Sequence, residues 1–230
     1  MDRRRFHRLC GGLLSGAAAL QQAVNASTAK TGDWPRSRLV DMRENGIKLA
    51  SLVPGDAHIF HYPYVTTPCF LLRLGSGTAA GSWPGGLGDD ASVVAFSAIC
   101  SHKMSHPARA ISHITYRAEP VVFTDDQGVR QEQAGLISCC SERSVYDPAG
   151  GAAVLSGPAP VPLAAIALDV DPDGTLVATA SLGADRYRQF FDAFEFRLKM
   201  EHRVSDVSAL SGEQAVAIPA SDFSQQQIRC

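Results

Sequence analysis

The clearest chemistry of this sequence lies in two stretches, Cys100-Ser101-His102 and Cys139-Cys140-Ser141-Glu142-Arg143-Ser144-Val145-Tyr146-Asp147-Pro148. The first stretch places a thiol and an imidazole on a single short turn. Thiolate sulfur and imidazole nitrogen are the ligands that soft and borderline metal ions prefer in proteins. We therefore expect a metal centre between two loops, with ligands from Cys100, His102 and one of Cys139 and Cys140.

The composition is that of an ordinary globular chain. Its 230 residues suit one domain with extensions, and 21 Lys and Arg residues nearly balance 23 Asp and Glu residues. This balance leaves no excess of positive charge, so we do not expect nucleic-acid binding. Twenty Gly and 13 Pro residues separate short apolar runs, which favours a β-rich fold with many turns.

Residues 1–26 have the pattern of an export signal. Arginines at positions 3, 4, 5 and 8 precede a weakly apolar run, and small residues at 24–26 offer a cleavage site. The arginines together with Phe6 resemble a twin-arginine signal. We therefore expect a periplasmic protein that reaches the membrane only through an uncleaved N-terminus. An ordinary secretory signal is the alternative.

The remaining chain divides into a linker at 27–45, a domain at 46–182 and an extension at 183–230. Runs of β-branched and aromatic residues predict strands at 47–52, 58–62, 69–74 and 92–96. Turn sequences at 125–128 and 171–174 predict two hairpins. The first hairpin would pair 121–124 with 135–138, and the second would pair 166–170 with 176–179.

The extension contains a helical pattern. Apolar side chains recur at intervals of three and four residues at Tyr187, Phe190, Phe191, Phe194 and Leu198, which predicts an amphipathic helix at 185–201. Its apolar face requires cover. Packing on its own domain is the favoured interpretation, and docking to a larger partner is the alternative.

The two loops and their surroundings resemble those of Rieske proteins. Ser-Val-Tyr-Asp-Pro at 144–148 and Gly-Pro-Ala-Pro-Val-Pro-Leu at 157–163 carry this resemblance along with the first loop. Within that group the chain is similar to the small subunit of arsenite oxidase over residues 52–180. That similarity is carried by Phe-His-Tyr-Pro at 60–63, Pro-Cys-Phe-Leu-Leu-Arg-Leu-Gly at 68–75 and Gly-Leu-Gly-Asp at 86–89.

The resemblance implies an all-β fold, a Rieske-type antiparallel β-sandwich with two cluster-binding loops, followed here by a C-terminal helical extension. It also implies a [2Fe–2S] cluster, in which two thiolates bind one iron and two imidazoles bind the other. Ser144 and Tyr146 would donate hydrogen bonds to the cluster sulfurs. In that family the protein passes electrons between a larger, molybdopterin-containing catalytic subunit and a periplasmic electron carrier.

The second loop departs from the family pattern because it contains no histidine. One register assigns Cys139 and Glu142 to the ligand positions, and the other assigns Cys140 and Arg143. Three outcomes stay open at this point. Glu142 ligates and its negative charge lowers the reduction potential, a histidine at 106 or 113 replaces the missing ligand, or no cluster binds.

The resemblance also places Ser105 and Ser141 where some Rieske proteins have a disulfide between the loops. Serine cannot form that disulfide, so we expect it to be absent here.

The leading hypothesis for the function is an electron-transfer subunit. A degenerate Rieske-fold subunit with a structural role only is the second hypothesis. A mononuclear zinc site built from Cys100, His102, Cys139 and Cys140 is the third.

Overall fold

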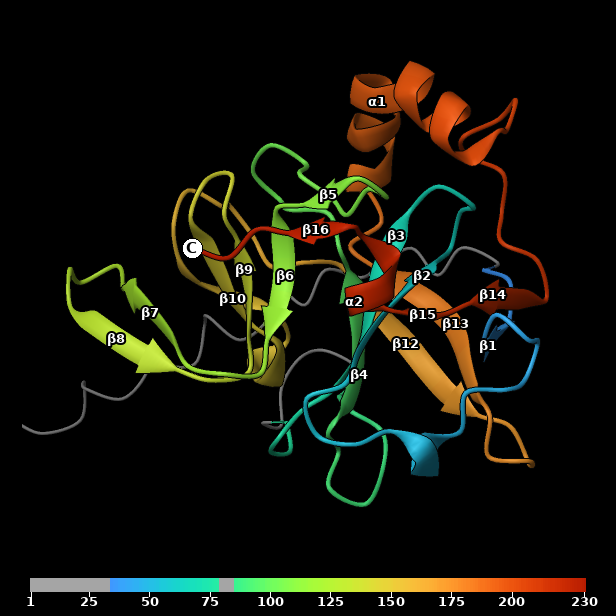
Figure 1. Ribbon diagram of the computed structural model, residues 1–230, viewed down its shortest axis with the longest axis horizontal. Coiled ribbons are helices and arrows are strands. Elements are labelled where there is room, and N and C mark those ends of the chain that lie inside the picture. Colours follow the sequence, from blue (N-terminus) through green and yellow to red (C-terminus); the bar gives the residue numbers. More distant parts are fainter. Residues whose placement is uncertain (1–33, 79–84) are drawn as a thin grey trace, which may run out of the picture.

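The computed structural model describes residues 34–78 and 85–230 and has the predicted all-β architecture with a small helical part (Figure 1). The predicted export signal at 1–26 lies outside the described residues. No helix within the described part is both long enough and apolar enough to cross a membrane.

The elements follow one another in short segments. The strands are β1 (Ser37–Val40), β2 (Ala57–His61), β3 (Pro68–Arg73), β4 (Val93–Ser97), β5 (Ile111–Ser112), β6 (Ile114–Arg117), β7 (Val121–Thr124), β8 (Arg130–Gln133), β9 (Leu136–Cys139), β10 (Ser144–Asp147), β11 (Ala153–Ser156), β12 (Ala165–Val170), β13 (Leu176–Leu182), β14 (Gln214–Val216), β15 (Ile218–Pro219) and β16 (Gln226–Gln227). The helices are η1 (Leu49–Ser51), η2 (Pro148–Gly150), α1 (Arg186–His202) and α2 (Ala220–Phe223).

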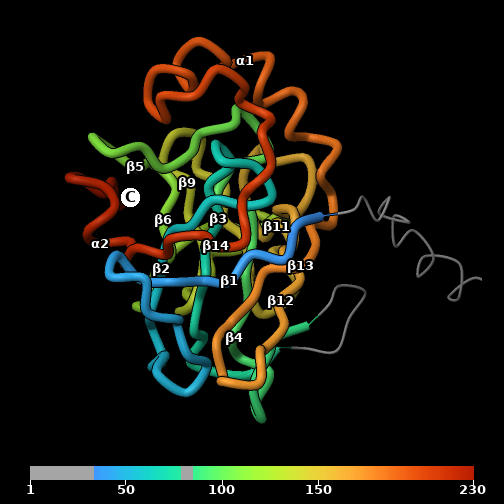
Figure 2. Tube along the Cα trace, turned by 90° about the vertical axis from the view of Figure 1, so that its right-hand side faces the viewer, coloured from blue at the N-terminus to red at the C-terminus, as the bar shows by residue number. Residues whose placement is uncertain are grey.

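Two main sheets form the body of the molecule. The larger has the strand order β14-β1-β13-β12-β4-β3-β2-β15, and the smaller has the order β11-β10-β9-β6. The pairs β7–β8 and β16–β5 form two further ribbons, and Figure 1 shows β7–β8 projecting away from the body. Figure 2 shows the chain from the side, with α1 at one end of the sheets.

Strand β3 shows why the larger sheet is stable. Successive side chains of a strand point to opposite faces, and both faces of this strand are buried. Phe70 and Leu72 join the core that contains Ile137 of the smaller sheet, whereas Leu71 joins a second core on the other face. Each such fully buried side chain stabilises the fold by about 1.5–3 kcal/mol. The first core also contains Cys100 and Cys139, so the two loops are rooted between the sheets.

Both ends of the described chain belong to the sheet, which corrects two predicted boundaries. Strand β1 lies within the predicted linker, yet it pairs with β13 on one side and with β14 on the other. Strands β14 and β15 lie within the predicted extension but complete the two ends of the larger sheet. Their short, partly polar sequences gave no strand pattern, and neighbouring strands supply the hydrogen bonds that fix them.

One predicted strand and one predicted strand pairing are wrong. Residues 47–52 do not form a strand, because the chain turns into η1 so that Leu49 and Leu52 reach the same core. Strand β7 pairs with β8, not with 135–138. All four side chains of β8 are exposed, so apolar patterning could not identify it. The apolar residues of β9 are instead buried in the smaller sheet. The predicted hairpin of β12 and β13 is confirmed.

Helix α1 confirms the predicted amphipathic helix. Its buried residues Tyr187, Phe190 and Leu198 pack with Ile99 and Ala164, which flank the loop region of the body. The aromatic face therefore covers its own domain, as the favoured interpretation expected. Phe196 is 80% exposed on the outer face.

Candidate metal centre

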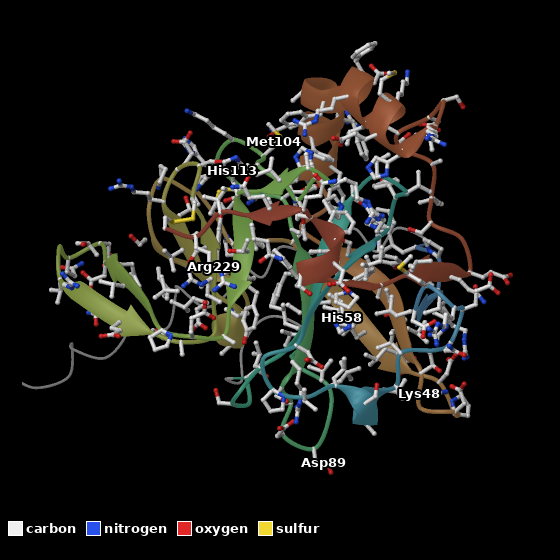
Figure 3. All side chains as sticks on the ribbon, viewed as in Figure 1. Lys48, His58, Asp89, Met104, His113 and Arg229 are labelled. Atoms are coloured by element: carbon white, nitrogen blue, oxygen red, sulfur yellow. A yellow bond between two sulfur atoms is a disulfide. The ribbon has the colours of Figure 1, made fainter. Side chains whose placement is uncertain are left out.

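The two predicted loops lie at the same end of the sheets. The first follows β4 and closes tightly, since the Cys100 carbonyl accepts a hydrogen bond from the Met104 amide at 3.0 Å and the Cys100 amide donates to the Ser105 carbonyl at 2.9 Å. The second joins β9 to β10, with Cys139 paired to Ser144 across the loop. Met104 has φ 58°, which marks the sharp turn of the first loop. Figure 3 labels Met104 at this end of the molecule, below α1.

Cys100 and Cys139 bring one thiol from each loop into contact. Both residues are fully buried and belong to the same core cluster. The Tyr146 hydroxyl lies 3.3 Å from the Cys100 sulfur and accepts a hydrogen bond from the Ser101 amide at 3.1 Å. The neighbouring Cys139 thiol and the Tyr146 hydroxyl lower the pKa of Cys100, whereas the neighbouring Cys100 thiol and burial raise the pKa of Cys139.

His102 and Glu142 form a second pair across the two loops. The Nδ1 atom of His102 lies 3.9 Å from the Oε2 atom of Glu142. The other carboxylate oxygen of Glu142 forms an ion pair with the Lys103 ammonium at 2.9 Å, and this neighbour lowers the pKa of Glu142. This geometry matches the register that pairs Cys139 with Glu142.

Two buried polar atoms near these pairs have no hydrogen-bond partner within the described part of the chain. They are Nδ1 of His102 and the hydroxyl oxygen of Ser144. A buried polar atom without a hydrogen bond costs about 1–3 kcal/mol, so each calls for an explanation. Both atoms suit a cluster, because Nδ1 is a metal-ligand atom and the hydroxyl would donate to sulfur.

The candidate donors come as two pairs, one formed by the thiols of Cys100 and Cys139 and the other by the side chains of His102 and Glu142. Among residues 34–78 and 85–230, no group of three or more His, Cys, Asp or Glu side chains is arranged to hold one metal ion. A [2Fe–2S] centre of Rieske type needs two such pairs, because each iron takes two protein ligands.

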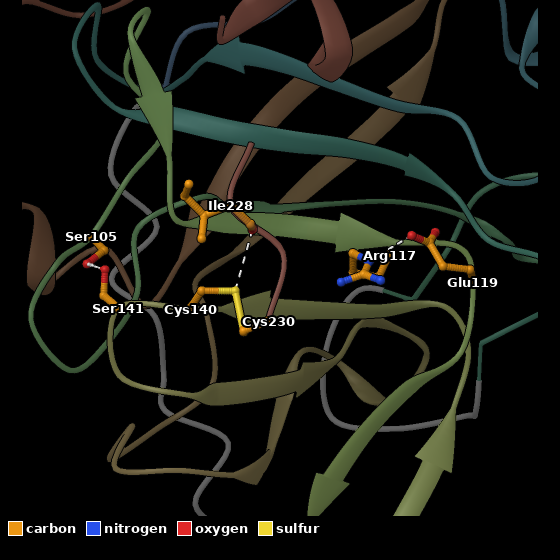
Figure 4. The surroundings of a disulfide bond; sticks show 7 residues. All are labelled: Ser105, Arg117, Glu119, Cys140, Ser141, Ile228 and Cys230. Atoms are coloured by element: carbon orange, nitrogen blue, oxygen red, sulfur yellow. Dashed lines mark hydrogen bonds and ion pairs between the residues drawn. A yellow bond between two sulfur atoms is a disulfide. The ribbon is translucent and has the colours of Figure 1, made fainter. Parts of the chain in front are cut away.

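Cys140 is the predicted metal ligand that the structure corrects. Its sulfur forms a disulfide with Cys230, across a sequence separation of 90 residues (Figure 4). A disulfide sulfur is not a thiolate ligand, so the register through Cys140 and Arg143 loses its thiol. Cys69, Cys100 and Cys139 are the free cysteines of the described residues. Cysteine spacing could not predict the disulfide, because Cys230 is far from Cys140 in sequence.

The two histidines proposed as substitute ligands have other environments. His106 points under α1, where its ring centroid lies 4.9 Å from that of Phe190 and 5.0 Å from that of Phe194. Its Nδ1 atom lies 2.9 Å from the Met104 carbonyl oxygen. For His113, the structure shows a backbone role, since its carbonyl accepts a hydrogen bond from the Cys140 amide at 2.7 Å. Glu142 is the candidate donor that the structure places beside His102.

Ser105 and Ser141 meet where the family resemblance places a disulfide between the loops. The Ser105 hydroxyl donates to the Ser141 hydroxyl at 2.9 Å (Figure 4). The two loops are thus in direct contact at this position, as the resemblance implied, but a hydrogen bond replaces the covalent link. Lys103 is a further contact between the loops that sequence reasoning did not identify, because its partner Glu142 lies on the other loop.

Comparison with known proteins identifies relatives over most of the chain. No protein-family model matches. The iodate reductase subunit IdrB of Pseudomonas sp. (strain SCT) is 31% identical over 176 residues, which is 75% of this chain and 76% of that protein. The iodate reductase subunit IdrB of Denitromonas iodatirespirans is 30% identical over 173 residues, which is 75% of this chain and 77% of that protein. Among solved structures, the soluble domain of the Rieske protein II (soxF) from Sulfolobus acidocaldarius has 25% identity and a TM-score of 0.43, and the match covers 67% of this chain and 81% of that chain.

Proposed function

Because the chain belongs to the family of the iodate reductase subunit IdrB and is a Rieske-type protein, we propose that it is an electron-transfer subunit of a larger oxidoreductase. We propose that it holds a [2Fe–2S] cluster between its two loops. The observation that supports this proposal most strongly is that two fully buried thiols, Cys100 and Cys139, from loops far apart in sequence belong to one core cluster.

The residues have distinct roles in this proposal. Cys100 and Cys139 would bind one iron, and His102 and Glu142 would bind the other. When bound, the cluster supplies one-electron redox chemistry. Tyr146 orients the Cys100 sulfur and is itself fixed by the Ser101 amide. The Ser144 hydroxyl is held at the root of the second loop, where a hydrogen bond to a cluster sulfur would satisfy it.

His102 lies on the exposed side of the proposed centre. Its side chain is 30% exposed, whereas both thiols are fully buried. An electron would therefore reach the surface by the shortest path at the imidazole. The exposed edge around His102 and Lys103 is where a redox partner would have to approach, and the sheets exclude water from the thiol side.

The test is direct analysis of anaerobically purified protein. We expect about two irons and two acid-labile sulfides per chain, with visible absorption and an electron paramagnetic resonance signal in the reduced state. Cys100→Ser should abolish this absorption, whereas Cys69→Ser should retain it because Cys69 is buried in β3 on the opposite face from the loop core. Zinc without sulfide would indicate a mononuclear site. Protein that binds no metal would leave the structural role of a degenerate Rieske-fold subunit.

The partners and compartment form a finer part of the proposal. The IdrB relatives are subunits of iodate reductase, which supports a larger catalytic subunit as partner here. We further propose a periplasmic electron carrier as the second partner and a molybdenum-containing catalytic subunit as the first. The similarity to the arsenite oxidase small subunit stays a prediction.

A periplasmic location is supported by two features. The arginine-rich segment resembles a twin-arginine signal, and the Cys140–Cys230 disulfide suits an oxidising compartment. Replacing Arg3 and Arg4 with lysine should leave the precursor in the cytoplasm, as measured by cell fractionation. Normal export of that variant would point to the general secretory route.

A further inference from the structure

Residues 224–230, which we call the strap, connect the two loops of the proposed centre. The strap runs beside residues 108–112, where the chain returns from the first loop. Gln225 donates its amide hydrogen to the Arg109 carbonyl at 2.9 Å, and β16 pairs with β5 in parallel. The Ile228 amide then donates to the Ser112 carbonyl at 2.8 Å. These bonds attach the strap to the first-loop side of the site.

At its far end the strap is bonded covalently to the second loop. Cys230 forms its disulfide with Cys140, the residue that directly follows the proposed ligand Cys139 (Figure 4). The Cys140 amide also donates to the His113 carbonyl at 2.7 Å, immediately beyond β5. Cys140 is therefore fixed by two contacts, the disulfide to the strap and the hydrogen bond to His113.

The start of the strap is anchored in the body of the molecule. Phe223 is buried in the core between the sheets, and the Arg109 guanidinium lies 4.4 Å from the centre of its ring. The Ser224 hydroxyl donates to the Ala108 carbonyl at 2.7 Å. The strap, and through its disulfide the second loop, is thus attached to the buried core as well as to surface residues. Between the loops themselves, by contrast, Ser105 and Ser141 form only a hydrogen bond.

We propose that Cys230 is a positioning residue, which acts through Cys140 to hold the second loop and its ligand Cys139 in place, and that this clamp closes only under oxidising conditions. The inference rests on the proposed function in naming Cys139 as a ligand. Closure exchanges two thiols for one disulfide and transfers two electrons and two protons to an oxidant. The oxidant would be a reactive protein disulfide in the cell envelope, which is reduced to a dithiol. A chain exported in folded form would therefore close its clamp after export.

Thiol alkylation of iron-free protein tests the clamp. In the double variant Cys140→Ser/Cys230→Ser, we expect iodoacetamide to modify Cys139 and Cys100 at least about tenfold faster than in the oxidised wild type, because local opening becomes easier. The rates are measured by mass spectrometry of the separate peptides. Cys69 is the internal control, since it is buried in β3 and reports opening of the whole domain. Its rate should not change.

A second measurement uses the unaltered sequence. Mild reduction of the wild type should speed alkylation at Cys139, and reoxidation with oxidised glutathione should restore protection. An equal increase in the alkylation rates of Cys69, Cys100 and Cys139 would show that the disulfide stabilises the whole domain, and it would overturn the inference. Unchanged rates at Cys139, or thiols at 140 and 230 that stay reduced after oxidation, would also overturn it. Because this assay needs no iron, a chain that binds no cluster would refute the proposed function without altering the result for the clamp.

Discussion

Replacing Phe190 with alanine should destabilise the protein strongly, because α1 is held to the body by this side chain. Phe190 is fully buried, and its ring centroid lies 4.9 Å from that of His106, 5.5 Å from that of Phe194 and 6.0 Å from that of Phe191. Loss of about 150 Å² of buried ring surface at about 25 cal/mol per Å² gives about 4 kcal/mol. This value lies within the range of about 3–5 kcal/mol for Phe→Ala changes in protein cores.

Phe196→Ala is the matched control on the same helix. Phe196 is 80% exposed, so its loss should change the free energy of unfolding by less than about 0.5 kcal/mol. Both variants exchange Phe for Ala within α1, and helix propensity therefore cancels in the comparison. Urea unfolding followed by circular dichroism gives the two free energies. A difference below about 1 kcal/mol would refute the packing argument.

Three other predictions concern the candidate site and its surroundings. Glu142→His should raise the reduction potential of the cluster in a redox titration, since a neutral imidazole replaces a carboxylate. Arg143→His should leave the potential unchanged, and the reverse result would restore the register through Cys140 and Arg143. Lys103→Met should lower that potential by removing the ammonium beside Glu142, whereas Lys103→Arg should preserve it; equal potentials in both variants would show that this charge does not act on the cluster. Burial lowers the pKa of His61 from 6.5 to about 3. Between these two pH values the imidazole is protonated in the unfolded chain but neutral in the folded chain. The free energy of unfolding should therefore fall as pH drops from about 6.5 toward about 3, by up to about 1.4 kcal/mol per pH unit from this group, and His61→Gln should reduce that slope.

Elements with strong local patterns were predictable from sequence. The spacing of Tyr187, Phe190 and Leu198 predicted α1 to within one residue at each end, because the apolar residues of an amphipathic helix recur every three or four positions in consecutive turns. Strands β2, β3 and β4 were likewise predicted from β-branched and aromatic runs, since each of them buries apolar side chains on both faces. In such segments local preference and tertiary packing agree.

Elements that depend on a distant neighbour were not predictable. Strand β1 lies between β13 and β14, which are more than 130 residues away, and it has only four residues of its own. Strand β8 exposes all its side chains, so its pairing with β7 leaves no apolar pattern. Hydrogen bonding to the partner strand fixes such segments, and a single stretch of sequence does not contain that information.

The candidate site divides in the same way. Cys100, His102 and Cys139 could be proposed as ligands from short motifs, because the candidate residues of each loop lie within a few positions of one another. The contacts of Lys103 with Glu142 and of Cys140 with Cys230 join different parts of the chain and needed the structure. Two adjacent cysteines left both registers open, and the disulfide favours the register through Cys139 because it removes the Cys140 thiol.

The Lys103–Glu142 pair suggests how a Rieske-type site can do without its second imidazole. A carboxylate in that position adds one negative charge to the ligand set, and this charge alone would lower the reduction potential. The Lys103 ammonium lies 2.9 Å from the carboxylate and adds one positive charge. The two charges sum to zero, as a neutral imidazole would, so the proposed site keeps the net charge of the usual ligand set. Since Lys103 follows His102 on the first loop and Glu142 lies on the second, the same ion pair also helps to hold the two loops together.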